Sequence, residues 1–307
     1  MKRMFGNVGS IALHMLVWMV SLIPFGVMYV VSDMLYYPFY YIVRYRRQTV
    51  RRNLTESFPE KEMDEIRKIE KDFYHYFVDI MLESTKLMTI TPEEMRLRMK
   101  FEGIDYVNQL LAQGKSISLF LGHYGNWEWV SSMGMGIVAD VVKAQVYRRL
   151  GNHAVDNLMR YMRGRFGHIC VEMNSTARFV NRVAMDGKPC IIGFLADQSP
   201  RKREVRHYVA FLSHNVPVHI GTERITRLYH YEAVFLSMKR LRRGYYVCEL
   251  ALLHDNPASL PEHELTRLYY DRLEKEIEGE PSMYLWSHKR FKYARIAEGS
   301  NRGCCQV

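Results

Sequence analysis

The chain has 307 residues, of which 48% are hydrophobic, 25% charged and 13% aromatic, so it can bury a full core. This composition excludes a disordered protein, a collagen-like fibre and a small disulfide-rich domain. The formal net charge of +10 indicates an acidic partner, such as nucleic acid, an anionic membrane surface or a phosphorylated substrate.

The first predicted element is an apolar segment near the N-terminus. No Asp, Glu, Lys or Arg occurs from Met4 to Ser32, and residues 11–31 have about the length of a bilayer-spanning helix. We therefore predict an N-terminal membrane-anchor helix. Four polar or helix-breaking residues weaken the pattern, so a kinked or oblique helix, or a hairpin within one leaflet, stays open: His14, Ser21, Pro24 and Gly26.

Two other interpretations of this segment fit less well. A cleaved signal peptide needs a shorter apolar run and an A-x-A site, yet no alanine lies between Ala12 and Ala112. A buried core helix with a solvated basic face is the second alternative, and some 20 apolar residues are unusual for a soluble helix.

The anchor is followed by an aromatic-rich stretch at 34–43 and then by a cluster of arginines. Six of the ten net charges lie within residues 1–52, which hold seven basic side chains and one acidic one. Aromatic and basic residues in this order suit the headgroup zone of an anionic membrane. We expect an anchor over 1–43 and a catalytic domain over 44–307 on the cytoplasmic face. The arginines are Arg44, Arg46, Arg47, Arg51 and Arg52.

The remainder of the chain predicts an α/β fold. Apolar residues spaced by three or four from Met63 to Ile80 predict a long amphipathic helix that ends before Pro92. Short β-rich runs then alternate with helical stretches, and two strands around 242–244 predict a hairpin. We expect a mixed, mostly parallel sheet flanked by helices and buried on both faces. The β-rich runs cover 116–122, 141–147, 168–172 and 190–196.

The five cysteines are scattered and form no CxxC pair, which argues against a disulfide framework and a zinc site. We expect no metal and no cofactor. Cys304 and Cys305 lie in a polar tail that could be lipidated, although a dispensable terminus is the preferred interpretation. The sequence GMGIVA at 134–139 matches a dinucleotide-binding fingerprint, but a helix precedes it instead of a strand, so we interpret Gly134 and Gly136 as helix-packing glycines.

The most informative segment is HYGNWE at 123–128, which follows an apolar strand. Ligands bind at this edge of open α/β sheets. His123 and Glu128 are about 140° apart on one helix, so His123 must precede a helix starting near Gly125 for the two side chains to meet. Glu128 could then hold one imidazole nitrogen while the other takes a proton from a substrate hydroxyl. A structural contact between the same two residues is an equal alternative.

This segment resembles the HX4(D/E) motif of glycerolipid acyltransferases and, in its H-x-G-N-W-E form, the late acyltransferases of lipid A biosynthesis, the lauroyl and myristoyl transferases. Three further segments are similar to that family in the same order. They are RRQTVRRNLTESFP at 46–59, GFLADQSPR at 193–201 and YLWSHKRFK at 284–292.

The resemblance implies transfer of a fatty acyl chain to a hydroxyl of a membrane glycolipid, with His123 as general base and Glu128 as its partner. The donor would be an acyl carrier protein, or coenzyme A in some relatives, and the location the bacterial inner membrane. We expect no nucleic-acid partner. Expected substrate-binding residues are Asn126, Arg148, Arg149, Arg163, Arg165, Asp197 and Gln198; arginine forks suit phosphate groups, and Asp197 with Gln198 would share the sheet edge of His123.

The acceptor and chain length stay open because SHNVP at 213–217 and Thr222-Glu223 depart from the family pattern. Another glycolipid such as a phosphatidylinositol mannoside is an alternative acceptor. A membrane-tethered basic binding module is the non-enzymatic alternative. His288 is interpreted as packed against Trp286 in preference to a catalytic role.

Overall fold

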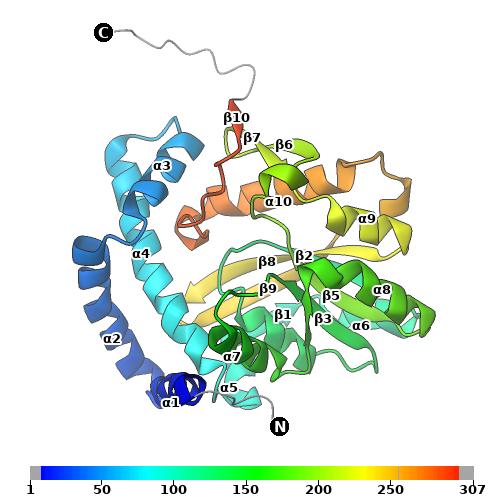
Figure 1. Cartoon of the computed structure of the whole chain (residues 1–307), viewed down its shortest axis with the longest axis horizontal. Coiled ribbons are helices and arrows are strands. Elements are labelled where there is room, and N and C mark those ends of the chain that lie inside the picture. The colour runs from blue at the N-terminus through cyan, green and yellow to red at the C-terminus, as the bar shows by residue number, and fades with distance from the viewer. Residues whose placement is uncertain (1–7, 255, 297–307) are drawn as a thin grey trace.

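The computed structural model describes residues 8–254 and 256–296 of the chain. The first five α-helices and a π-helical segment, η1, lie at one side of the molecule, where α1 and α2 pack against the long helix α4 (Figure 1). The amphipathic helix predicted from Met63 is confirmed as α4. The bounds are α1 Val8–Leu22, α2 Phe25–Tyr37, η1 Pro38–Val43, α3 Arg47–Ser57, α4 Met63–Lys86 and α5 Pro92–Arg98.

The N-terminal apolar segment is broken where the sequence predicted one helix. Among the described residues, no single helix is long and apolar enough to cross a membrane. Together, Gly9–Leu22 and Phe25–Val43 are long and apolar enough, but the chain bends by 112° between them. Pro24 stands at the break. Proline lacks a backbone N–H donor, so the preceding helix cannot continue through it. The single anchor helix is thus corrected to a bent pair.

The arginine cluster divides between two environments. Arg47 and Arg51 both donate to the buried carboxylate of Glu70, at 2.8 and 2.7 Å, and therefore hold α3 on α4. Arg44, Arg46 and Arg52 stay exposed. Only part of the predicted basic cluster is therefore free to meet a membrane surface.

A seven-stranded mixed sheet forms the centre of the molecule, in the order β1-β9-β8-β2-β5-β3-β4. The pairs of β2 with β5 and β8, and of β3 with β4 and β5, are parallel, whereas β8 and β9 are antiparallel. The mostly parallel sheet and its four predicted strand runs are confirmed. The bounds are β1 Met99–Glu102, β2 Ile117–Leu121, β3 Val142–Tyr147, β4 Ile169–Glu172, β5 Cys190–Leu195, β8 Glu232–Arg242 and β9 Tyr245–His254.

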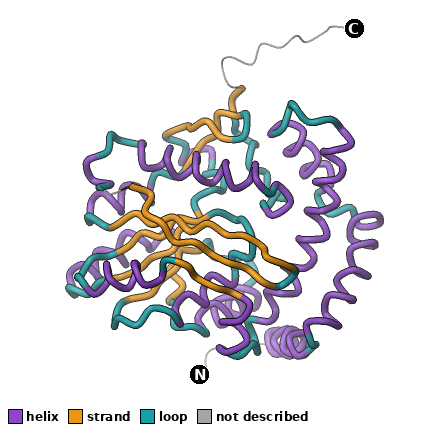
Figure 2. The backbone as a smooth tube through the Cα atoms, turned by 180° about the vertical axis from the view of Figure 1, so that it is seen from behind, coloured by secondary structure: helices purple, strands orange, loops and turns teal. Residues whose placement is uncertain are grey.

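Helices cover both faces of this sheet, as the continuous apolar strands predicted (Figure 2). All five residues of β2 are buried. In β5 the side chains alternate: Ile191 belongs to the large core, while Ile192 and Phe194 pack into a second cluster with Val180 of α8. The connecting elements are α6 Ile104–Ala112, η2 Trp129–Met135, α7 His153–Gly164, η3 Met173–Ser175 and α8 Thr176–Met185.

The predicted hairpin is confirmed as β8 and β9, and its turn contacts the N-terminal helices. Gly244 has φ = 74°, and a Cβ there would lie 1.9 Å from the Tyr29 hydroxyl of α2, so the turn needs glycine. Arg243 beside it bridges Asp33 of α2 and Asp79 of α4 at 2.7 and 2.5 Å. The bent helix pair is therefore fastened to the sheet.

The last third of the chain adds a small three-stranded sheet and two helices. The order of this sheet is β10-β7-β6, and α10 packs against β6, β8 and β9. The bounds are η4 Lys202–Glu204, β6 His207–Phe211, β7 His214–Val218, α9 Gly221–Leu228, η5 Pro257–Ser259, α10 Glu264–Gly279, η6 Pro281–Met283 and β10 Arg295–Ile296.

The structure also bears on the predictions for the glycines at 134–136 and for the cysteines. The 3-10 helix η2 surrounds Gly134, and a Cβ on this residue would lie 2.2 Å from the carbonyl oxygen of Phe166, so Gly134 is a packing glycine. Cys170, Cys190 and Cys248 are free thiols. Cys304 and Cys305 lie outside the described residues.

Candidate active site

His123 and Asp197 meet at the carboxyl edge of the central sheet. β2 and β5 are parallel neighbours whose last residues, Leu121 and Leu195, are paired in register. His123 stands two residues beyond the first strand and Asp197 two residues beyond the second. Parallel strands end on the same side, so this register brings the two side chains together. The prediction that Asp197 shares the sheet edge of His123 is confirmed.

The contact between them is a buried histidine-carboxylate dyad. Nδ1 of His123 donates to Oδ1 of Asp197 at 2.7 Å, and the His123 backbone N–H donates to Oδ2 at 3.2 Å. Burial alone raises the pKa of Asp197, but the charge of His123 and these two hydrogen bonds prevail and hold it below its ordinary value. With the proton on Nδ1, Nε2 of the ring has a free lone pair and can act as a base.

Gln198 occupies that free lone pair. Its side-chain Nε2 donates to Nε2 of His123 at 3.0 Å. A substrate hydroxyl that hydrogen-bonds to this nitrogen has to take the place of the Gln198 amide. The Gln198 amide thus occupies the position that a donating hydroxyl group would take.

Glu128 does not hold the imidazole, in contrast to the sequence prediction. Its two carboxylate oxygens accept from Nη2 and Nε of Arg163 at 2.6 and 2.7 Å, and Trp127 donates to Oε1 at 3.1 Å. Burial alone raises the pKa of Glu128, but the charge and hydrogen bonds of Arg163 lower it below its ordinary value. The 3-10 helix η2 starts at Trp129, later than predicted, and residues 125–128 form an irregular turn. The carboxylate that contacts the imidazole is instead that of Asp197, just after the neighbouring strand β5.

Asn126 and Arg165, both predicted as substrate ligands, make their contacts within the protein. Asn126 is fully buried; its amide donates to Glu83 at 2.7 Å, and its oxygen accepts from the Trp129 backbone at 3.2 Å. Arg165 donates to the carbonyl oxygens of Leu87 and Ile90, just beyond the end of α4. Asn126 therefore stabilises the turn that carries His123, and Arg165 joins the end of α7 to the segment after α4.

Arg148 and Arg149 follow β3 at the same edge of the sheet. Arg148 is exposed, and its charge contributes to a lowered pKa of His219, which Asp197 also influences. Arg149 contacts His153 at 3.1 Å and Glu172 at 3.7 Å on the surface. The charge of Arg148 thus acts close to the dyad, whereas Arg149 contacts surface groups.

The turn that carries His123 is held by β8 and by residues 283–285. Gly125 has φ = 65°, and a Cβ there would meet the sulfur of Met238 at 2.3 Å, so this position needs glycine. The backbone of 283–285 pairs with it, because Gly125 N–H donates to Met283 and Leu285 N–H donates to His123. The closing sequence block therefore lies against the turn that carries His123.

Glu83 of α4 supports the same turn. Its buried carboxylate accepts from Tyr29, Asn126 and Tyr246 at 2.7 to 2.8 Å, and its backbone carbonyl accepts from the Trp129 indole at 2.9 Å. An acidic residue in the last turn of an amphipathic helix is the only signal of this role in the sequence, and Glu83 is not among the predicted site residues.

Two residues of the closing block also surround the dyad. His288 is half-buried; burial lowers its pKa to about 4, with Asp197 and His123 close enough to influence it. Arg290 is 1% exposed, donates to Pro217 and Tyr270, and its charge helps to lower the pKa of Asp197. The interpretation of His288 as packed against Trp286 stays a prediction.

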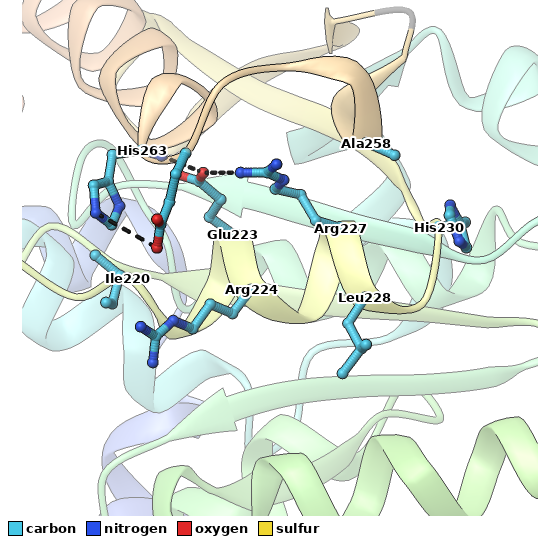
Figure 3. A pocket seen from close by; sticks show the side chains of 9 residues that line it. Ile220, Glu223, Arg224, Arg227, Leu228, His230, Ala258 and His263 are labelled. Atoms are coloured by element: carbon cyan, nitrogen blue, oxygen red, sulfur yellow. Dashed lines mark hydrogen bonds and ion pairs between the residues drawn. The ribbon is translucent and has the colours of Figure 1, made fainter.

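A surface hollow is present away from the dyad. It has a volume of about 440 Å³ and lies between α9 and the segment before α10 (Figure 3). A second, narrower cavity is lined mostly by apolar side chains and by Gly193, and Trp127 connects it to the dyad, since the Trp127 ring lies 5.5 Å from that of His123. This cavity has a volume of only about 20 Å³, room for about one water molecule.

The chain is similar to known proteins over most of its length. The family described as bacterial lipid A biosynthesis acyltransferase matches residues 3–293. A lipid A biosynthesis palmitoleoyltransferase of Escherichia coli (strain K12) is 22% identical over 258 residues, which cover 83% of this chain and 82% of that protein. A lipid A biosynthesis acyltransferase of Shigella flexneri is similar to the same extent.

Proposed function

The chain belongs to the bacterial lipid A biosynthesis acyltransferase family, and on that premise we propose that it acylates a hydroxyl group of a lipid A precursor. The enzyme is an acyltransferase. The donor in this proposal is an acyl thioester, with acyl carrier protein favoured over coenzyme A. The observation that carries the proposal is the buried dyad of His123 and Asp197 at the sheet edge.

In the proposed mechanism, Nε2 of His123 takes the proton of the acceptor hydroxyl after that hydroxyl has replaced the Gln198 amide. The hydroxyl oxygen forms a bond to the thioester carbonyl carbon. The carbon–sulfur bond then breaks, and the imidazolium returns the proton to the leaving thiolate. Asp197 keeps the ring oriented and stabilises its positive charge. Because the acceptor hydroxyl attacks the thioester directly, no covalent enzyme intermediate is needed.

Glu128 acts in this scheme through Arg163. The bidentate pair fixes a guanidinium and the indole of Trp127, whose ring lies against His123. Glu128 is thus a positioning residue in our proposal, while His123 and Asp197 are the acid-base pair. Arg148 and Arg149 remain candidates for phosphate groups of the acceptor or of the phosphopantetheine arm, because guanidinium forks match phosphate oxygens.

The proposed location is the cytoplasmic face of the bacterial inner membrane, with residues 1–43 as the membrane-contacting part and 44–307 as the catalytic part. A net charge of +10 supports contact with anionic lipid and with an acidic carrier protein.

The test is acyl transfer by the purified full-length chain in mixed micelles or membranes, from acyl carrier protein or coenzyme A thioesters to a lipid A precursor. Mass spectrometry should detect a gain of one acyl chain. His123→Ala should lose roughly 10² to 10⁴-fold of this activity. The matched control is His254→Ala, because His254 ends β9 at the opposite edge of the sheet. Equal losses in both variants would contradict the proposal.

A further inference from the structure

The two N-terminal helices are apolar on the outside and partly polar on the inside. In α1, Met15, Leu16 and Met19 are 58%, 54% and 53% exposed, whereas His14 and Ser21 are buried. More than half of the exposed large hydrophobic side chains among the described residues lie between positions 11 and 45. A surface helix of a soluble protein has the opposite arrangement, so the outer face of α1 and α2 is built for an apolar medium.

The bend between the helices is held by polar groups of α4 and the turn that follows it. A helix break frees carbonyl groups, and no water satisfies them in hydrocarbon. Here the ammonium of Lys86 donates to the carbonyls of Ser21 and Ile23, and the Thr89 hydroxyl donates to Ser21. Lys86 is 5% exposed, so straightening the pair would leave a buried cation without its acceptors. The 112° angle is thus part of the packed structure.

Helix α2 is fastened to α4 along its whole length. Tyr29 donates to Glu83 at 2.8 Å, Ser32 to Asp79 at 2.6 Å, and Tyr40 of η1 to Glu70 at 3.0 Å. These contacts occupy the inner face over about three turns. Only the outer face of α2 is free to contact lipid, and α2 cannot leave α4 to cross a bilayer without breaking them.

The end of this helical pair has the side chains of a headgroup zone. Tyr37 and Tyr41 are exposed on it, followed by the exposed guanidinium groups of Arg44 and Arg46. Aromatic and basic side chains in this order suit the boundary of an anionic leaflet. Arg46 also donates to the carbonyl of Ser287, next to His288, so this boundary adjoins the dyad.

We propose that the outer faces of α1 and α2 lie side-on in one leaflet of an anionic phospholipid bilayer, with no segment of the pair crossing it. This inference rests on the membrane location in the proposed function and adds how the chain is held. An acceptor lipid in that leaflet then reaches His123 past Arg44 and Arg46, from the side where the headgroups lie.

The first experiment asks whether lipid is the partner. Full-length chain is mixed with vesicles of phosphatidylethanolamine and phosphatidylglycerol, and the bound fraction is measured after flotation in high salt. Met15→Glu should reduce binding several-fold, because a charge enters the apolar face. Met185→Glu is the matched control, since Met185 is 81% exposed on α8 of the catalytic part. If Met15→Glu changes self-association in solution and leaves vesicle binding unchanged, the face is an interface between copies, and the proposal is overturned.

The second experiment measures depth. Trp18 is 48% exposed on α1, and the fluorescence lost in Trp18→Phe isolates its signal from the other tryptophans. Vesicles carry bromine either near the headgroups or near the acyl-chain ends. A side-on helix predicts loss of most Trp18 fluorescence with the shallow label and little with the deep one. Strongest quenching by the deep label would overturn the inference and leave the proposed function standing.

The two failures are distinguishable because acyl transfer is assayed separately with detergent-dispersed acceptor. No quenching at either depth would remove both the one-leaflet arrangement and the membrane location. Loss of transfer with normal shallow quenching would remove only the proposed chemistry.

Discussion

The sheet edge that holds His123 and the hollow between α9 and α10 contain the same residue types in different arrangements. Both have a histidine, a buried carboxylate and arginines. At the sheet edge, Asp197 accepts from an imidazole nitrogen and leaves the other nitrogen as a base. In the hollow, Glu223 accepts from the backbone N–H groups of His263 and Thr266 at 2.6 and 2.9 Å, and so caps the start of α10 (Figure 3).

The difference teaches which contact makes a carboxylate chemically useful. The ring of His263 faces the exposed Glu262 at 3.7 Å and stacks on His207, so no buried carboxylate fixes its tautomer. A carboxylate on a ring N–H orients a base, whereas a carboxylate on backbone N–H groups stabilises a helix end. We therefore expect mutations at the two places to separate activity from stability.

The largest expected effect is that of Asp197→Asn on transfer. The amide can no longer stabilise the imidazolium and favours the wrong tautomer, so activity should fall roughly 10² to 10⁴-fold. The double variant with His123→Ala should be little worse than His123→Ala alone, since both residues act through one ring. Turnover by purified variants with unchanged thermal unfolding measures this. Multiplicative losses would mean that the two residues act independently.

Glu128→Gln should have a smaller effect on activity and a clear effect on stability. The buried guanidinium of Arg163 loses its counter-charge, which typically costs about 3 to 5 kcal/mol of unfolding free energy when no partner remains; the amide keeps part of the contact. We expect roughly a tenfold loss of turnover and a non-additive effect with Arg163→Gln. Denaturant unfolding and transfer assays on the single and double variants check this. A loss as large as that of Asp197→Asn would restore Glu128 to the acid-base machinery.

Glu223→Gln should change stability without changing the chemistry. The capped helix start loses charge-assisted hydrogen bonds worth about 0.5 to 2 kcal/mol for an N-terminal cap. Turnover per folded molecule should stay at the wild-type value because the hollow does not include the dyad. Parallel measurement of denaturation midpoint and turnover tests the comparison. Altered KM in this variant would show that the hollow takes part in substrate binding.

The smallest expected effect concerns pH. The pKa of His288 is lowered to about 4 by burial, below the ordinary value of 6.5, so the unfolded chain binds more protons between these pH values. This group therefore contributes stability that is present above pH 6.5 and is lost as pH falls toward 4. His288→Gln should flatten the slope of unfolding free energy in that window. Denaturation curves at several pH values measure the slope, and an unchanged slope would mean that His288 is not buried as described.

The sequence by itself determined the elements that depend on local pattern. Short, continuous β-rich runs predicted the strands, the spacing after Met63 predicted α4, and the sequence around Arg243 and Gly244 predicted the hairpin turn. It also placed His123 just after a buried strand, which is why the site was found. Family membership followed from four ordered motifs and is confirmed over residues 3–293.

Only the tertiary structure decided which groups touch. Asp197 is 74 positions from His123 and reaches it through the register of β2 with β5, while Glu128, five positions away, turns to Arg163. Asn126 is committed to Glu83, and the break that Pro24 makes in the apolar N-terminal run is held at its angle by Lys86, which donates to the carbonyls there. Local sequence fixes backbone preference over a few residues, but a side chain's partner depends on which distant strand or helix packs beside it, and that is a property of the whole fold.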